Sequence, residues 1–378
     1  MGFIDRLRVF MKFEPTITVD ELEERYFKFQ NVTQFELPNS FKKNQIGLIS
    51  SAIQFFITVS KAGSPKIIFY DYDCENDHED NLKKIISDPI CLAIILMFNE
   101  IYDSKGVEFK RRINKNIVSR LDENIYFSGH RIQMLAVDHS IEKYAYPNCF
   151  YDWSGERSMQ GASYYSYLLS DFFKERIKSA NVNSSELSTL GSFISELIDN
   201  TEQHGKFEFT TGKQNRSIRG MVLNYHMVKK NDNIESMSGN LISIFDYIQR
   251  SKQEDRALHL LEISIFDSGV GIYDSFGGAT SEVGTEKEVV SKSFLKGVTS
   301  KRNGLGYGRG LNNVRQTLNQ RGGLIKIRSG SVSLYRDYNL EHLKDENTDV
   351  MFFEEDSGDG AGIANVSGVA YTILVPVK

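Results

Sequence analysis

Three short segments of the chain combine residue types that can do chemistry. The first spans residues 195–205, where Glu196 and Asn200 are four positions apart within a helical pattern. Residues with this spacing share one face of a helix, so the pair sets a carboxylate beside an amide. An amide oxygen is a ligand that Mg²⁺ accepts, and a carboxylate can orient or deprotonate a nucleophile next to a phosphate. A solvated polar helix face is the alternative interpretation of the same residues.

The second segment sets an acid and two glycines directly after a strand pattern. Residues 261–266 alternate as a β-strand and are followed by Asp267, Gly269 and Gly271. An aspartate at the end of a strand can accept a hydrogen bond from the exocyclic amine of adenine. Glycines adopt positive φ without steric cost and let the backbone lie against a flat ring. A polar turn without a ligand is the alternative here.

The third segment is a glycine repeat that leads into a helical pattern beginning at Leu311. Its alternating glycines are Gly304, Gly306, Gly308 and Gly310. The free N–H groups and the positive dipole end of such a helix start attract phosphate oxygens. Lys301 can add a cationic contact to the phosphates. The alternative is that Lys301 is a solvated loop residue without a ligand. The repeat lacks the GK[ST] ending of a P-loop, and no strand directly precedes it as in a Rossmann motif.

Taken in this order, the three segments resemble the ATP-binding motifs of the GHKL superfamily, which includes DNA gyrase B, Hsp90, histidine kinases and MutL. The residues of these segments are most similar to those of the histidine-kinase-like branch, and the resemblance covers about residues 185–378. It implies the Bergerat fold, an α/β sandwich in which helices lie on a mixed, largely antiparallel sheet. It also implies that Asn200 binds Mg²⁺, that Glu196 is the catalytic carboxylate and that Asp267 recognises adenine. The implied ATP-binding set is completed by Gly269, Gly271, Lys301, Gly306, Gly308, Gly310 and Leu311.

The chain departs from this family pattern in its spacing. Residues 231–256 are expected to form an inserted helical element, and residues 331–367 a second insertion that is acidic and glycine-rich near its end. Residues 272–304 are expected to form a long ATP lid. Many kinases carry a threonine after the glycine that starts the last strand, but this chain has Val369 there, which leaves Thr372 as the candidate substitute.

The N-terminal part of the chain, residues 1–180, alternates helical and strand patterns and carries no chemistry that we recognise. We expect it to be an α/β domain with a regulatory or sensing role. A polar break at Asn181 marks the expected start of the ATP-binding domain, residues 181–378. Asn183 and Glu186 have the spacing of a capping box, which predicts that the next helix begins there.

Composition restricts the function classes further. The 378 residues are 40% hydrophobic and 25% charged with a net charge of −5, which is typical of a globular protein with a sizeable core. Interspersed acids and bases argue against electrostatic nucleic-acid binding, and the longest apolar run, residues 90–98, is too short to span a bilayer. Three separated cysteines indicate reduced thiols and a cytoplasmic protein. Residues 1–13 mix apolar and basic residues and are expected to form an amphipathic helix.

The leading hypothesis is a Mg²⁺-dependent ATPase in which hydrolysis drives lid closure as a cytoplasmic regulatory switch. The first alternative is a protein kinase that phosphorylates a histidine or serine of a partner, although the histidines lack the acid and proline context of a phosphoacceptor helix. The second alternative, a non-catalytic nucleotide-binding module, is disfavoured because Glu196, Asn200 and Asp267 are all present. Besides ATP, we expect a protein partner or a second copy of the chain as a homodimer.

Overall fold

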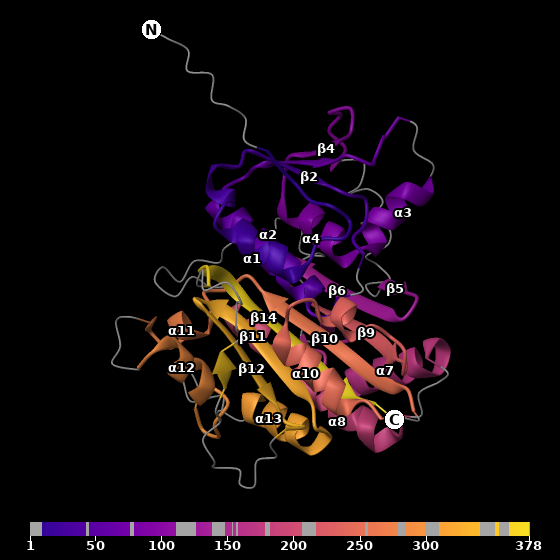
Figure 1. The fold of residues 1–378 in the computed structure, drawn as a ribbon, viewed down its shortest axis with the longest axis vertical. Coiled ribbons are helices and arrows are strands. Elements are labelled where there is room, and N and C mark those ends of the chain that lie inside the picture. The colour runs from indigo at the N-terminus through magenta and orange to yellow at the C-terminus, as the bar shows by residue number, and fades with distance from the viewer. Residues whose placement is uncertain are drawn as a thin grey trace.

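The chain folds into four layers: a parallel sheet, a layer of helices, an antiparallel sheet and a second layer of helices (Figure 1). The α/β class expected from the sequence is therefore confirmed. No helix in the part of the chain described below is long and apolar enough to cross a membrane. The computed structural model describes residues 10–42, 45–75, 79–110, 126–137, 148–152, 154–155, 158–177, 182–205, 217–253, 256–278, 284–298, 310–340, 352–354 and 363–377.

The first layer is a parallel sheet whose four strands follow one another in chain order. Its first strand includes residues that were expected to lie in an amphipathic helix: Met11 is buried between the exposed Phe10 and Lys12, an alternation that suits a strand. Residues 1–9 lie outside the described residues. The strands are β1 (Phe10–Lys12), β2 (Gln34–Leu37), β3 (Lys66–Phe69) and β4 (Ile101–Asp103), linked by α1 (Val19–Tyr26), η1 (Phe29–Asn31), α2 (Leu48–Ala62), α3 (Glu79–Ser87) and α4 (Pro89–Met97).

The third layer is an eight-stranded sheet with the order β13-β12-β11-β14-β10-β9-β6-β5. All of its strand pairs are antiparallel. The mixed sheet that we expected here is therefore wrong in that detail, since among the described residues parallel pairs occur only in the N-terminal sheet. The strands are β5 (Tyr126–Ser128), β6 (Arg131–Val137), β9 (Ile218–Val228), β10 (Leu258–Asp267), β11 (Leu324–Gly330), β12 (Val332–Asp337), β13 (Phe353–Glu354) and β14 (Val366–Pro376), and β7 (Tyr151–Asp152) with β8 (Ser158–Met159) forms a separate ribbon.

Helices cover both faces of this antiparallel sheet. One face carries α7 (Ala162–Arg176), α8 (Ser184–His204), α11 (Ile272–Ser275), α12 (Glu286–Lys292) and α13 (Gly310–Arg321). The other face carries α2 and α4 together with α9 (Ile234–Ser238) and α10 (Ile242–Ser251), two short helices within the stretch where an inserted helical element was expected. Helix α8 begins with the predicted capping box, in which Asn183 accepts from the Glu186 N–H and Glu186 accepts from the Asn183 N–H.

Helices α2 and α4 are buried on all sides because they lie between the two sheets. Every residue of α4 from Pro89 to Leu96 is buried, and α2 is buried from Leu48 to Val59 except at Ser51. A helix of this kind is stable only where both of its faces are covered. One hydrophobic core consequently runs from the N-terminal sheet through α2 to the antiparallel sheet, for example through Phe35, Phe56 and Leu374.

The change from one sheet to the other does not coincide with the boundary expected near residue 181. It falls between β4 and β5, so that β5 and β6 belong to the same sheet as the strands that follow residue 181. The expected boundary lies between α7 and α8, which pack against each other on one face of that sheet. The sheet is therefore built from both sides of the expected boundary.

A continuous core predicts that the two sheets unfold together. Phe56→Ala should lower the free energy of unfolding by about 3–5 kcal/mol, because it removes a fully buried ring from α2. The matched control Phe27→Ala, at a ring that is 55% exposed, should change it by less than about 0.5 kcal/mol. Urea denaturation should be followed by circular dichroism and by the fluorescence of the single tryptophan. Two separated transitions, of which Phe56→Ala moves only one, would contradict a shared core.

Candidate functional site

Helix α8 presents Glu196 and Asn200 on its flank, as their spacing predicted. Its apolar stripe packs on the antiparallel sheet through residues such as Phe193 and Leu197, which are fully buried. Glu196 and Asn200 are half-buried and lie one turn apart. The carboxylate and the amide therefore sit at the border between the core and the surface.

The start of α13 lies against this pair. A Cβ atom at Gly310 would be 2.7 Å from Glu196 Oε2 and 3.7 Å from Asn200 Nδ2. Asn313, one turn into α13, places its Nδ2 3.5 Å from Glu196 Oε1. The first and third sequence segments thus meet at Gly310, where a Cβ atom would require the Glu196 carboxylate to move. Leu311, the next residue, packs partly buried against the core.

The Asn200 amide has unsatisfied hydrogen-bonding capacity. Its Nδ2 atom is buried and finds no hydrogen-bond partner among the described residues. Rotation about χ2 exchanges the amide nitrogen and oxygen, and the oxygen in that position is a suitable ligand for Mg²⁺. Among the described residues no group of three or more His, Cys, Asp or Glu side chains is placed to hold a metal ion. A metal held here would take most of its other ligands from phosphate and water.

Asp267 ends β10 on the same face of the sheet as α8. Its side chain is 4% exposed, and burial raises the pKa of its carboxyl to about 6 despite the hydrogen bond from the Gly269 N–H and the nearby charge of Lys61. The Gly269 nitrogen is 2.8 Å from Asp267 Oδ1. A buried acceptor at a strand end, followed by a glycine turn, is the arrangement that the sequence predicted.

Glycines bring the neighbouring segments into close contact with Asp267. Gly205, which follows α8, would place a Cβ atom 3.0 Å from Asp267 Cβ, so the second segment lies beside the end of the first. Gly368, at the start of β14, has φ +73° and would place a Cβ atom 1.9 Å from the Asp267 carbonyl oxygen. Gly271 has φ +90° and lies against Ser329, whose Oγ accepts a 3.0 Å hydrogen bond from the Ile272 N–H.

Arg219 is a charged neighbour of Asp267 that our sequence analysis missed. It is 1% exposed and lies directly opposite Asp267 in the register of β9 and β10. Its guanidinium forms a 2.8 Å ion pair with Glu202 of α8 and donates a 2.5 Å hydrogen bond to Tyr151 Oη. A single arginine within a strand pattern gives no signal in the sequence, because only the fold brings the aspartate and Glu202 beside it.

Two further expectations concern the last strand and the predicted phosphate-binding residues. Val369 pairs with Asp267 on the α8 face, whereas the Thr372 hydroxyl lies on the opposite face, 2.7 Å from Ser50 Oγ of α2. Thr372 is therefore not a substitute for the family threonine at the site. The predicted phosphate-binding residues Lys301, Gly306 and Gly308 lie outside the described residues.

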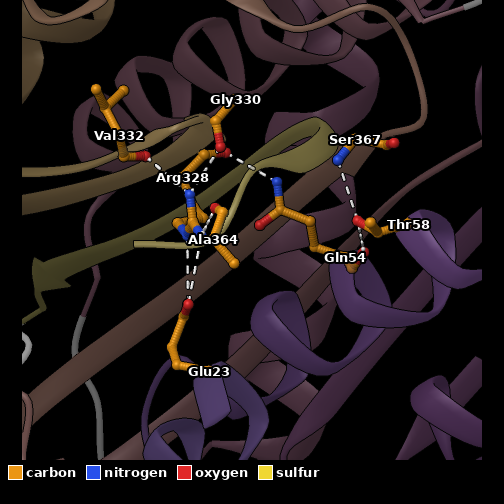
Figure 2. Close-up of polar contacts among 8 residues, drawn as sticks. All are labelled: Glu23, Gln54, Thr58, Arg328, Gly330, Val332, Ala364 and Ser367. Atoms are coloured by element: carbon orange, nitrogen blue, oxygen red, sulfur yellow. Dashed lines mark hydrogen bonds and ion pairs between the residues drawn. The ribbon is translucent and has the colours of Figure 1, made fainter. Parts of the chain in front are cut away.

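Helix α2 supports the candidate site from behind, through the opposite face of the sheet (Figure 2). Thr58 Oγ1 accepts a 3.0 Å hydrogen bond from the Ser367 N–H, next to Gly368. Gln54 donates a 2.9 Å hydrogen bond from Nε2 to the Arg328 carbonyl oxygen. The last turn of α2 reaches the glycine turn itself, since Lys61 Nζ donates to the Gly269 carbonyl oxygen at 3.1 Å.

Comparison of the chain with protein-family models found no match, and a search among curated proteins found no significant relative.

The contact between Gly368 and Asp267 makes a testable stability prediction. Gly368→Ala should destabilise the protein by at least about 2 kcal/mol more than Gly106→Ala, because both glycines have positive φ but only Gly368 would clash with backbone. Gly106 has φ +80° and open space around its Cβ position, so it isolates the cost of the backbone conformation. Urea denaturation of both variants measures the difference. Equal losses of unfolding free energy in the two variants would show that the close approach of Gly368 to Asp267 does not contribute to the cost of the substitution.

Proposed function

We propose that this protein binds ATP with Mg²⁺ between α8, the end of β10 and the start of α13, and hydrolyses it as a GHKL-type ATPase. The observation that carries the proposal is the convergence of three separate sequence segments around α8. Glu196 and Asn200 lie beside Gly310, and Gly205 at the end of the same helix lies beside Asp267, because a Cβ atom at either glycine would meet these side chains. A polar helix face or a plain glycine turn would not need the other two segments beside it.

Each group then has one task. Asp267, when ionised, accepts a hydrogen bond from the exocyclic amine of adenine, and the glycine turn lies against the ring. The start of α13, a helix of 12 residues, directs its free N–H groups at the phosphates. Asn200 would hold Mg²⁺, which neutralises charge on the phosphates.

Glu196 acts as the general base in this proposal. Its carboxylate accepts a proton from a water molecule whose oxygen forms a bond to the γ-phosphorus. The bond from that phosphorus to the bridging oxygen breaks, and ADP and phosphate leave. Asn313 donates toward Glu196 Oε1 at 3.5 Å, a long contact that orients the carboxylate without neutralising it.

The proposed output is a switch in which the N-terminal helices respond to the nucleotide. Lys61 of α2 donates to the Gly269 carbonyl oxygen, in the turn that would lie against adenine. Thr58 holds the backbone of β14 one residue before Gly368, which touches Asp267. A shift of the glycine turn on nucleotide binding would therefore act on α2 directly.

Substitution of the two α8 residues separates binding from turnover. Glu196→Ala should keep ATP affinity and lower phosphate release about 10²- to 10⁴-fold, because it removes only the general base. Asn200→Ala should weaken Mg²⁺-dependent ATP binding about tenfold or more, the equivalent of about 1.4 kcal/mol. Glu175→Ala, at an exposed position of α7, is the matched control and should change neither quantity. Titration calorimetry and a phosphate-release assay provide the measurements.

Two results of these assays would contradict the proposal. Absence of saturable binding of ATP, ADP and a non-hydrolysable analogue would remove the nucleotide site altogether. Unchanged phosphate release in Glu196→Ala would remove Glu196 from its role. Incubation with γ-labelled ATP distinguishes the kinase alternative. Acid-labile label on protein indicates phosphoryl transfer to histidine, acid-stable label indicates transfer to serine, and free phosphate alone indicates hydrolysis.

The raised pKa of Asp267 predicts that ATP affinity depends on pH. The ionised carboxylate accepts from the adenine amine more strongly than the protonated carboxyl does, and burial raises its pKa to about 6. Affinity should therefore be constant above pH 7 and fall by up to about tenfold by pH 5, where roughly a tenth of the carboxyl groups are ionised. Purine riboside triphosphate, which lacks the amine, is the control for titration of the phosphates themselves. The same acid-dependent loss with this analogue, or in Asp267→Asn, would contradict the role of Asp267.

A further inference from the structure

A polar pocket opens on the face of the antiparallel sheet opposite the candidate ATP site. Its volume is about 660 Å³, and it lies between the turn that joins β5 to β6, the end of β9, and α9. It is about 17 Å along the strand from Asp267, because Asn224 in its floor pairs with Glu262, five residues earlier in β10. The proposed function does not use this pocket.

The floor of the pocket holds a cation, Arg131, that forms no ion pair among the residues the structure describes. Arg131, Asn224 and Glu262 are in register across β6, β9 and β10, so their side chains lie on one face of the sheet. Arg131 lines the pocket, and among the described residues its buried Nε atom has no hydrogen-bond partner. Burying part of an unpaired guanidinium is costly, and an anion bound to the part of Arg131 that lines the pocket would offset some of this cost.

The two acids whose charges act on Arg131 are already engaged elsewhere. Asp88 caps α4, where its Oδ1 accepts from the Ile90 and Cys91 N–H groups at 2.9 and 3.1 Å. Glu262 accepts from the Gly47 N–H at 2.8 Å and lies 2.7 Å from His226 Nε2. Neither acid forms an ion pair with Arg131 within the described ranges.

The other lining groups include imidazole, amide and hydroxyl side chains that can donate hydrogen bonds. His130 packs edge-on against Tyr225 with ring centroids 5.7 Å apart. His226, which follows Tyr225 in β9, also lines the pocket. Asn233 and Ser236 form an exposed rim on the side of α9. One acid, Asp232, also faces the pocket, but its Oδ2 accepts a 2.7 Å hydrogen bond from the Lys229 N–H. A cationic floor with amide, imidazole and hydroxyl groups above it suits an oxyanion attached to a small polar body.

We propose that this pocket binds a small molecule that carries a carboxylate or phosphate group, and that its occupancy regulates the candidate ATP site through α2. The anionic group pairs with Arg131, and the rest of the molecule contacts the rim at α9. The binding part of the proposal stands by itself, whereas the regulatory part rests on the proposed function.

Two connections join the pocket to the beginning of α2. His226 of the lining contacts Glu262, whose carboxylate accepts from the N–H of Gly47, the residue that caps α2. On the other wall, the carbonyl oxygen of Met237 accepts a 2.7 Å hydrogen bond from the Ile46 N–H. The far end of α2 donates from Lys61 to Gly269 in the candidate site. Helix α2, 15 residues and about 22 Å long, is thus held at one end by the pocket and at the other by the glycine turn.

Binding is tested on the full chain by NMR of histidine labelled with ¹³C at Cε1. Inorganic phosphate and succinate are titrated separately, and saturable shifts of the His130 and His226 resonances are expected with at least one of them. The probe that binds with the higher affinity identifies the ligand class: phosphate indicates a phosphate ester, and succinate indicates a carboxylic acid. Arg131→Gln should weaken binding at least tenfold, Arg131→Lys should restore part of it, and Arg256→Gln, at an exposed arginine, should leave it unchanged.

Absence of a saturable shift with both probes, or equal affinity in Arg131→Gln, would overturn the site. If Arg131→Gln does not fold, Ser236→Phe provides the test, because Ser236 is exposed at the rim and a phenyl ring there would close the pocket. Unaltered binding in that variant would equally overturn the site.

Regulation is tested by measuring ATP affinity with and without a saturating concentration of the stronger probe. We expect a change of at least threefold in the natural chain and none in Arg131→Gln, with the reciprocal effect of ATP on the affinity for the probe. An ATP affinity that the bound probe leaves unchanged would overturn the regulatory link. If the probe binds but ATP does not, the proposed function fails while the site stands.

Discussion

The architecture depends on one constraint, which is that α2 has no face suited to water. The helix is apolar around most of its circumference, so it must be covered by a sheet on each side. Yet Ser50, Gln54 and Thr58, spaced by four, form a buried polar stripe along it. Buried polar groups are costly unless they are paired, and each of these three is paired with β14 or β11 of the antiparallel sheet. Hydrophobic burial places the helix between the sheets, and the stripe fixes its position along them.

This arrangement gives the two faces of the antiparallel sheet different tasks. The α8 face carries Glu196, Asn200 and Asp267, beside a hydrophobic core of its own. The α2 face carries buried polar residues such as Glu262, whose pKa would be raised by burial but is lowered overall by hydrogen bonds from His226, Gly47 and Asn224. Adjacent residues of a strand point to opposite faces of the sheet. Each strand therefore connects the polar residues of the α8 face with those of the α2 face through its backbone.

The sequence predicted the elements around the candidate site better than their wider surroundings. The capping box of α8, the common face of Glu196 and Asn200, and an acid at the end of β10 follow from local spacing, and all three are observed. Arg219 could not be found, because its partners come from α8 and β7 and no periodicity connects them. The division near residue 181 also rested on local polarity, whereas sheet membership depends on pairing between distant strands such as β6 and β9.

The polar stripe of α2 also restricts how such a chain can evolve. Proteins assembled from modules exchange input domains freely when a linker is the only connection between them. Here a replacement for the N-terminal half would have to supply a helix with a hydroxyl, an amide and a hydroxyl at positions matching Thr372, Arg328 and Ser367. Recombination at a domain boundary would leave those groups of the sheet buried and unpaired. Change on either side of this junction must therefore proceed by paired substitutions, and the two halves of the chain are expected to share one evolutionary history.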